Sequence, residues 1–271
     1  MALRPRDRVH RLGDIAVEIA VDGESGPVPA LCVLENITVA FGGVKALDDV
    51  SLSLDADAGI TGIIGPNGAG KSTCLSVIAG ARRPTAGSVE VLGRSLKGKT
   101  NTARVARWGV ARTFQIPRPF VDMSVRENVT VARLATRRGK TADQAAIVDE
   151  LLERTGLASI SAKLAGSLGL ASRKKLEVAR AMAIEPRLIL LDEVFEGLSD
   201  SEIHELVTIL RGLHDDGIRL VLVEHVLRAL RQLAASLVVF EKGAVIAQGA
   251  VDEVLEDPRV KQAYLGFGGA T

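Results

Sequence analysis

The sequence predicts an α/β fold, in which strands and helices alternate along the chain. Continuous apolar runs at 188–191 and 220–223 are typical of strands that are buried on both faces of a parallel sheet. A helical pattern at 200–213 separates these two runs. A glycine-rich loop connects the apolar run 60–64 to a second helical pattern at 74–79. These three observations predict a parallel core sheet with helices packed against it.

The residues before this loop have the pattern of an extension followed by a mixed sheet. Apolar residues alternate with others over 15–21, which predicts one strand, and 22–29 has the composition of a turn or linker. We expect residues 1–29 to be an N-terminal extension and linker, to which the sequence assigns no function. Short apolar runs and turns alternate over 31–64, and 88–92 predicts a further strand.

The middle of the chain differs, because helical periodicity replaces the short apolar runs. Apolar residues recur at helical spacing over 143–154 and 174–182. We therefore expect an inserted helical subdomain from about residue 100 to 182. The expected organisation is a main domain over 30–250 that contains this insertion, followed by a C-terminal tail over 251–271.

Composition disfavours several classes of function. The chain has 271 residues, 47% of them hydrophobic, and its net charge of +1 with 3% aromatic residues disfavours a nucleic-acid binder. The two cysteines, Cys32 and Cys74, lack metal-binding spacing and favour a reducing compartment. No apolar run approaches the roughly 18 residues that span a bilayer. We therefore expect any membrane association to occur through a partner.

The loop after the apolar run 60–64 matches the phosphate-binding pattern G-x-x-x-x-G-K-[ST] without a mismatch. Glycines let backbone N–H groups converge on an anion, and the helix that starts near Lys71 adds its positive N-terminal dipole. Lys71 is predicted to contact the β- and γ-phosphates of a nucleotide, and Ser72 to bind Mg²⁺. The alternative is an ordinary glycine-rich turn. The predicted nucleotide-binding residues of this loop are Gly65, Pro66, Asn67, Gly68, Ala69, Gly70, Lys71, Ser72 and Thr73.

Two carboxylates, Asp192 and Glu193, follow the apolar run 188–191. In an open α/β sheet, ligands bind at the carboxyl ends of the strands, which is where this pair is placed. Asp192 is therefore predicted to bind Mg²⁺, and Glu193 to act as a general base or to polarise the attacking water. The alternative is a surface pair that caps the following turn. Together with the phosphate-binding loop, the pair predicts nucleotide hydrolysis.

Three further residues carry a resemblance to a known family. Phe41 precedes the phosphate-binding loop, Gln115 ends the segment Ala-Arg-Thr-Phe-Gln, and His225 follows a predicted buried strand. Taken singly, a glutamine of this kind is usually a surface residue, and such a histidine is usually structural. In this order, however, the chain resembles the ATP-binding subunits of ABC transporters over about residues 31–250. These subunits are P-loop NTPases with a RecA-like mixed sheet and an inserted helical subdomain.

The resemblance implies a role for each of these residues. Phe41 would stack on the adenine ring, and Val44 from the same segment would also bind the nucleotide. Gln115 would contact Mg²⁺ and the attacking water, and His225 would contact the γ-phosphate. Lys71, Gln115, Glu193 and His225 would then form the catalytic set, with ATP and Mg²⁺ as cofactors.

Finer features resemble the ATPases of branched-chain amino-acid importers. They lie in the segments 41–47, 109–115, 118–120, 123–129 and 260–266. This resemblance implies an ATP-sandwich dimer, bound as a peripheral subunit to the cytoplasmic face of the bacterial inner or plasma membrane. Residues 115–129 would meet a coupling helix of integral-membrane permease subunits. The cargo, branched-chain amino acids or related small polar solutes, would be selected by the permease and a periplasmic or extracellular solute-binding protein.

The resemblance is weakest at the signature loop, which family members present to the nucleotide on the opposite subunit. The usual sequence is Leu-Ser-Gly-Gly-Gln, and here it is Leu168, Gly169, Leu170, Ala171 and Ser172. Without the serine hydroxyl, a hydrogen bond to a charged phosphate is lost, at a cost of about 1.5–3 kcal/mol. In the D-loop, Ser199 stands where Asp or Asn is usual. We therefore expect a heterodimer with a second ATPase subunit that has an intact loop, rather than a homodimer.

Two other functions are compatible with these motifs. The first is an ABC ATPase of another envelope machine, such as one for lipid or lipopolysaccharide extraction, although these usually keep an intact signature loop. The second is a regulatory nucleotide-binding subunit that does not hydrolyse ATP, against which Glu193 and His225 argue. The motifs specify the fold better than they specify the cargo.

Overall fold

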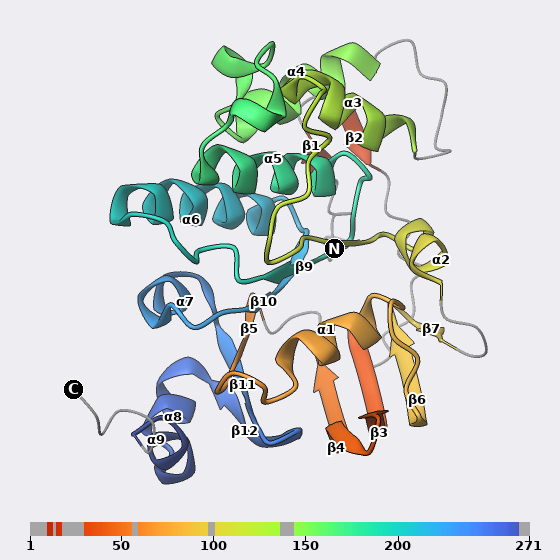
Figure 1. Cartoon of the computed structure of the whole chain (residues 1–271), viewed down its shortest axis with the longest axis vertical. Helices are drawn as coiled ribbons and strands as arrows, with labels where there is room; N and C mark the ends of the chain where they lie inside the picture. Colours follow the sequence, from red (N-terminus) through yellow and green to blue (C-terminus); the bar gives the residue numbers. More distant parts are fainter. Residues whose placement is uncertain are drawn as a thin grey trace, which may run out of the picture.

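The computed structural model describes residues 10–12, 15–17, 30–55, 59–96, 101–135 and 144–265 (Figure 1). In the extension, strand β1 (His10–Leu12) pairs antiparallel with β2 (Ile15–Val17). The strand expected over 15–21 is therefore present in its first three residues. The rest of that segment and the expected linker 22–29 lie outside the described residues.

A six-stranded mixed sheet forms the core, in the order β12-β11-β5-β10-β9-β8. All neighbouring strands in it are parallel except β11 and β12. The loops that follow β5, β9 and β10 therefore lie at one edge of the sheet. The strands are β5 (Thr61–Ile64), β8 (Val110–Arg112), β9 (Leu188–Asp192), β10 (Arg219–Val223), β11 (Ser236–Glu241) and β12 (Ala244–Ala250).

A second sheet is antiparallel and lies beside the core sheet, with helix α1 (Lys71–Ile78) packed against both. Figure 1 shows α1 next to β3 and β4. Cys74 and Leu75 of α1 and Cys32 of β3 belong to the same buried hydrophobic cluster. Both cysteines are therefore inaccessible to solvent. The strand order is β4 (Val44–Leu54), β3 (Cys32–Phe41), β6 (Ala86–Val91) and β7 (Arg94–Ser95).

Three helices from the middle of the chain, α3, α4 and α5, gather at one end of the molecule in Figure 1, whereas α2 lies apart from them. No helix in the described ranges has the length and apolar character that a membrane crossing requires. The helix predicted over 143–154 begins at Gln144, and residue 143 lies outside the description. The remaining helices are α2 (Thr102–Arg107), α3 (Val125–Leu134), α4 (Gln144–Arg154), α5 (Leu170–Met182), α6 (Asp200–Asp215), α7 (Leu227–Leu233), α8 (Val251–Glu256) and α9 (Pro258–Leu265), with 3-10 turns at Ala158–Ile160 and Ala165–Ser167.

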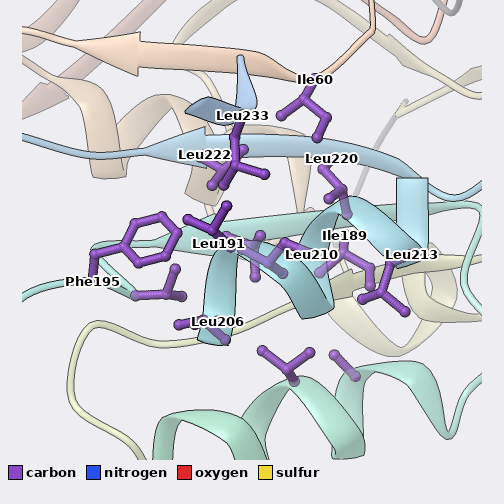
Figure 2. Packing of buried hydrophobic residues seen from close by; sticks show 14 of the residues in the cluster. Ile60, Ile189, Leu191, Phe195, Leu206, Leu210, Leu213, Leu220, Leu222 and Leu233 are labelled. Atoms are coloured by element: carbon purple, nitrogen blue, oxygen red, sulfur yellow. The ribbon is translucent and has the colours of Figure 1, made fainter. Parts of the chain in front are cut away.

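Successive residues of the central strands belong to two different hydrophobic clusters. Leu188 and Leu190 of β9 pack toward α1 and the second sheet, whereas Ile189 and Leu191 pack toward helices on the opposite face. Figure 2 shows this second cluster, in which Leu210 of α6 lies against the strand residues. Alternate residues of the strand are therefore buried on opposite faces of the sheet, as the continuous apolar run predicted.

One strand interrupts the region that the sequence predicts to be helical. β8 is only three residues long and pairs in parallel with β9 at the edge of the core sheet. Three residues are too few to show an alternating pattern, so this strand depends on tertiary pairing rather than on a local signal. The pairing carries the loop after β8, which contains Gln115, toward the edge where the phosphate-binding loop lies.

Candidate functional site

The loop between β5 and α1 requires glycine at two positions. Gly65 and Gly70 have φ angles of 149° and 104°. A Cβ on Gly65 would lie 2.2 Å from the carbonyl oxygen of Phe240, and one on Gly70 would lie 2.4 Å from that of Ala46. Both neighbours are backbone atoms, so neither can move aside easily. The cradle of backbone N–H groups therefore depends on these two residues.

Lys71 lies at the centre of this loop and is 94% buried, with 6% of its surface exposed. Its Nζ donates to the carbonyl oxygens of Gly65 at 2.7 Å and Pro66 at 2.9 Å. Burial lowers the pKa of Lys71, and the carboxylates of Glu193 and Asp192 oppose that shift. A desolvated cation at the N-terminus of α1, beside a glycine-rich loop, is suited to bind the charged oxygens of a phosphate chain.

Ser72 and Asp192 place two oxygen ligands together at the mouth of the loop. The Ser72 hydroxyl donates to Asp192 Oδ1 at 3.1 Å, although the two residues are 120 positions apart. Among the described residues, no cluster of three His, Cys, Asp or Glu side chains could hold a metal ion without other ligands. Mg²⁺ usually takes one or two protein oxygens and completes its shell with water and phosphate oxygens. The Ser72–Asp192 pair fits that requirement.

Glu193 adopts a left-handed backbone conformation, with φ at 50°, that is held by hydrogen bonds. Its N–H donates to the carbonyl of Val223 at 2.9 Å, and its own carbonyl accepts from Lys174 Nζ at 2.7 Å. Burial and the nearby Glu196 raise the pKa of Glu193, and His225 acts in the opposite direction. A raised pKa strengthens a carboxylate as a proton acceptor, which suits a general base.

The loop after β8 brings Gln115 to the same carboxylate. Gln115 Nε2 donates to Glu193 Oε2 at 2.5 Å and to Glu196 Oε2 at 3.4 Å. The loop is held in place by Glu177 of α5, whose two oxygens accept from the backbone N–H groups of Phe114 and Arg118. The hydrogen bonds of Gln115 therefore come from an ordered loop rather than from a free surface segment.

The structure also reveals two buried charges that the sequence interpretation did not single out. Glu224 is fully buried and accepts from the N–H of Phe195 at 2.9 Å, while its other oxygen has no hydrogen-bond partner. Burial raises the pKa of Glu224 to about 7, and the positive charge of Lys174 partly opposes this. Together, Glu224 and Lys174 fix the turn that carries Glu193. For Glu224, the sequence signal that could have indicated a role in the site is a charged residue directly after a buried strand.

Most of the predicted site residues line one cleft, which has a volume of about 850 Å³. Phe41 and Val44 are not among the residues that line it. Both are exposed, and the guanidinium of Arg82 lies 4.6 Å from the centre of the Phe41 ring. Asp192 lies beneath the cleft and reaches it through Ser72. The lining residues are Ala46, Gly65, Pro66, Asn67, Gly68, Ala69, Gly70, Lys71, Ser72, Thr73, Gln115, Glu193, Glu196, His225 and Ala263.

The predicted signature loop is likewise absent from the lining of this cleft. Gly169 is the N-cap of α5, and no side chain caps the helix. A Cβ on Gly169 would meet no atom within 4 Å, so its surroundings are open. In the D-loop, Ser199 is the N-cap of α6 and forms a capping box with Glu202, whose Oε2 accepts from the Ser199 N–H at 2.8 Å and from its hydroxyl at 2.7 Å. The side chain of Ser199 therefore has a local structural partner.

Comparisons with known families agree with this geometry. A family described as "ABC transporter" matches residues 47–196, and one described as "Branched-chain amino acid ATP-binding cassette transporter" matches residues 244–266. The chain belongs to the ABC transporter family. The ABC ATPase is 34% identical to the high-affinity branched-chain amino acid transport ATP-binding protein LivG of Salmonella typhimurium, over 87% of this chain and 98% of that one. It is 30% identical to BraF of Pseudomonas aeruginosa, over 86% and 96%.

Solved structures of relatives confirm the predicted fold class. A nucleotide-free ATP-binding cassette from an ABC transporter matches with a TM-score of 0.77 at 30% identity, covering 87% of this chain and 99% of that one. The ADP conformation of an ATP-binding cassette also matches with a TM-score of 0.77 at 30% identity, over 88% and 99%. The chain is therefore an ABC-type ATPase with the mixed sheet and helical insertion of that fold.

Proposed function

We propose that this ABC ATPase binds and hydrolyses ATP to drive an importer of branched-chain amino acids or related small polar solutes. The observation that carries the proposal is the convergence of Lys71, Ser72, Gln115 and Glu193 on one cleft. The names of its relatives, at 30% to 34% identity over most of the chain, support the class of cargo. The match of residues 244–266 to a branched-chain amino acid family supports it independently.

In this mechanism, each residue acts on charge or on water. Lys71 and the loop N–H groups would stabilise the phosphate oxygens, and Ser72 with Asp192 would hold Mg²⁺, which would neutralise negative charge on the phosphates. Glu193 accepts a hydrogen bond from, or a proton of, the attacking water, and its raised pKa favours that role. Gln115 orients the Glu193 carboxylate. His225 lines the cleft beside it and would contact the γ-phosphate.

Phe41 and Val44 would bind the nucleotide outside the phosphate cleft. The exposed ring of Phe41 offers a flat face to adenine, and the Arg82 guanidinium already lies over the same ring. Adenine would therefore compete with or extend this cation–π contact. Replacement of Phe41 by alanine is expected to weaken nucleotide affinity and to leave the hydrolysis rate at saturation largely unchanged.

The proposed dimer is an ATP sandwich in which the signature loop, 168–172, faces the nucleotide of the partner. In an ABC dimer each ATP lies between one chain's phosphate-binding loop and the other chain's signature loop. Gly169 and Ala171 offer backbone groups and no hydroxyl to that partner site. This supports a heterodimer with a second ATPase subunit that supplies an intact loop. Co-purification of the tagged chain should therefore recover a different ABC ATPase.

The loop after β8 and helix α3 supply a surface for permease subunits, on the cytoplasmic side of the membrane. Apolar side chains of this segment are unusually exposed, with 73% exposure for Ile116 and 65% for Leu134. Such patches mark contacts with other proteins. Because Gln115 precedes Ile116 and binds Glu193, a permease contact here would act directly on the site of hydrolysis. The exposed apolar residues of the segment are Phe114, Ile116, Phe120, Val121, Met123, Val131 and Leu134.

The decisive experiment is ATP hydrolysis and solute uptake by the complete transporter reconstituted in liposomes. The complex should contain this chain with its co-purified ATPase and permease subunits, plus the solute-binding protein. Leucine is expected to stimulate hydrolysis and to be taken up, and Lys71→Ala should abolish both. Hydrolysis that responds to lipid and ignores amino acids would contradict the importer function. If the unmodified chain did not bind nucleotide at all, the ATPase roles assigned above would be contradicted.

A further inference from the structure

Arg112 is a charged residue beside the nucleotide cleft that the mechanism above leaves without a role. It ends β8, three residues before Gln115, and 16% of its side chain is exposed. Its Nη2 donates to Asp192 Oδ2 at 3.0 Å, and its Nη1 donates to Ser76 Oγ at 2.9 Å. Its Nε is buried and has no hydrogen-bond partner. Two nitrogens of the guanidinium are therefore hydrogen-bonded, and the third, Nε, is buried without a partner.

These contacts involve both halves of the proposed Mg²⁺ site. Asp192 Oδ1 accepts from Ser72, and Asp192 Oδ2 accepts from Arg112, so both carboxylate oxygens are in use. Ser76 lies one turn after Ser72 on α1, and its hydroxyl donates to the Ser72 carbonyl at 2.6 Å. Arg112 thus binds the metal-binding carboxylate and the helix that carries the metal-binding hydroxyl.

A second cavity, of about 340 Å³, lies on the other side of Arg112. Arg112, Arg118 and Arg180 contribute cationic side chains to its wall, and Glu177 contributes one carboxylate. The Arg112 guanidinium lies 5.8 Å from the centre of the Phe114 ring, which also lines the cavity. An arginine that left Asp192 would find space in this cavity beside the Phe114 ring, whose centre also lies 5.4 Å from the Arg118 guanidinium. Glu177, which already accepts from two backbone N–H groups, supplies the negative charge of this wall.

A Mg²⁺ ion and the Arg112 guanidinium would repel each other if both bound the Asp192 carboxylate. Mg²⁺ binds carboxylate oxygens at about 2.1 Å, and the Arg112 nitrogen is 3.0 Å from Asp192 Oδ2. The two positive centres would then lie within about 5 Å in a partly buried site, where screening is weak. Binding at Asp192 must therefore disfavour the Arg112 contact, and the Arg112 contact must disfavour binding by the same factor.

We propose that Arg112 is a resident counter-ion of Asp192 that competes with Mg²⁺ and moves into the second cavity when Mg²⁺ binds. This proposal rests on the proposed role of Asp192 as a Mg²⁺ ligand. Phe114 and Arg118 line this cavity and belong to an exposed segment. The movement of Arg112 therefore makes the surroundings of that segment depend on whether Mg²⁺ is bound. Arg112 is thus a positioning residue that links the two sites.

The first test measures the affinity of the protein–ADP complex for Mg²⁺ by calorimetry, and for Mn²⁺ by electron paramagnetic resonance. Arg112→Gln removes the competing charge and should bind Mg²⁺ about tenfold more tightly than the unmodified chain. Arg112→Lys keeps the charge without the two-pronged contact and should show a smaller increase. Unchanged or weaker binding by Arg112→Gln, or equal gains in both variants, would overturn the proposal. If Asp192→Asn leaves Mg²⁺ affinity unaltered, the assigned role of Asp192 fails instead.

The second test detects the movement in the unmodified active site. Cys32 and Cys74 are buried, so a single cysteine introduced at Ala106, which lines the second cavity, should provide the main site for a maleimide probe. We expect Mg²⁺ with ADP to slow labelling several-fold relative to ADP with a chelator. The difference should vanish when Arg112→Gln is added. A cysteine at Asp252, an exposed position on α8, serves as the control. Equal labelling of Ala106→Cys with and without Mg²⁺ would overturn the movement.

Discussion

The nucleotide cleft and the signature loop of this ABC ATPase differ in how their residues are held. In the cleft, Lys71, Glu193 and Gln115 each make hydrogen bonds that fix their position within the chain. At the signature loop, Gly169 is exposed, has no side chain and lies in open surroundings. The side chains of the first region are positioned by contacts within the chain, whereas Gly169 of the second region makes no such side-chain contact. A single chain therefore specifies the geometry of one region much more tightly than that of the other.

The largest expected effect comes from removing the proposed base in the cleft. Glu193→Gln should lower the hydrolysis rate about 10²–10⁴-fold while ATP still binds, because proton acceptance is lost and the cleft is retained. Steady-state hydrolysis and equilibrium ATP binding measure the two properties separately. Glu196→Gln, a neighbour in the same cleft, is the matched control and should have a much smaller effect. Similar losses in both variants would show that local charge matters rather than Glu193 itself.

A pair of glycine substitutions compares the two regions directly. Gly65→Ala should reduce nucleotide affinity at least about a hundredfold, since its Cβ would overlap a backbone carbonyl at 2.2 Å. Gly169→Ala should leave affinity unchanged, because nothing lies within 4 Å of the added carbon. Titration with a fluorescent nucleotide measures both, and circular dichroism checks folding. Strong binding by Gly65→Ala would mean that the loop can rearrange.

The buried Glu224 makes the stability of the cleft depend on pH. Its pKa is raised from 4.5 to about 7, so the folded state retains a proton that the unfolded state has lost between these values. Its contribution to stability therefore falls as pH rises from about 4.5 to 7, and stays low above that. At pH 8, Glu224→Gln should be more stable by up to about 3 kcal/mol, at 1.36 kcal/mol per pKa unit. Urea unfolding at pH 5 and pH 8 measures this, and a gain of equal size at both would contradict it.

The smallest expected effect restores the missing hydroxyl of the signature loop. Gly169→Ser fits the open surroundings of that residue and would add a donor toward a phosphate on the partner. At about 1.5–3 kcal/mol, one such bond corresponds to at least about a tenfold faster hydrolysis at the partner's site. Gly169→Ala, which adds the carbon without the hydroxyl, is the control. Comparing both in the assembled dimer tests the asymmetry, and no difference between them would show that backbone donors suffice.

Much of the cleft could be predicted because its motifs are local. The loop 65–73 matches a contiguous pattern, and Asp192 and Glu193 follow a strand whose apolar run reports burial on both faces. Arg112, Lys174 and Glu224 were not predicted as part of the site. Their contacts join positions 80, 19 and 29 residues apart, and no local pattern records such pairing.

The sequence by itself determined the alternation of strands and helices, the phosphate-binding loop and the family. These features depend on periodicity and on glycine chemistry, which act within a few residues. Only the tertiary structure decided that β8 joins the core sheet, that Ser199 caps α6 rather than facing the cleft, and that Arg112 occupies the carboxylate of Asp192. Each of these depends on which distant backbone edge or charge lies nearby, and that is a consequence of packing rather than of local sequence.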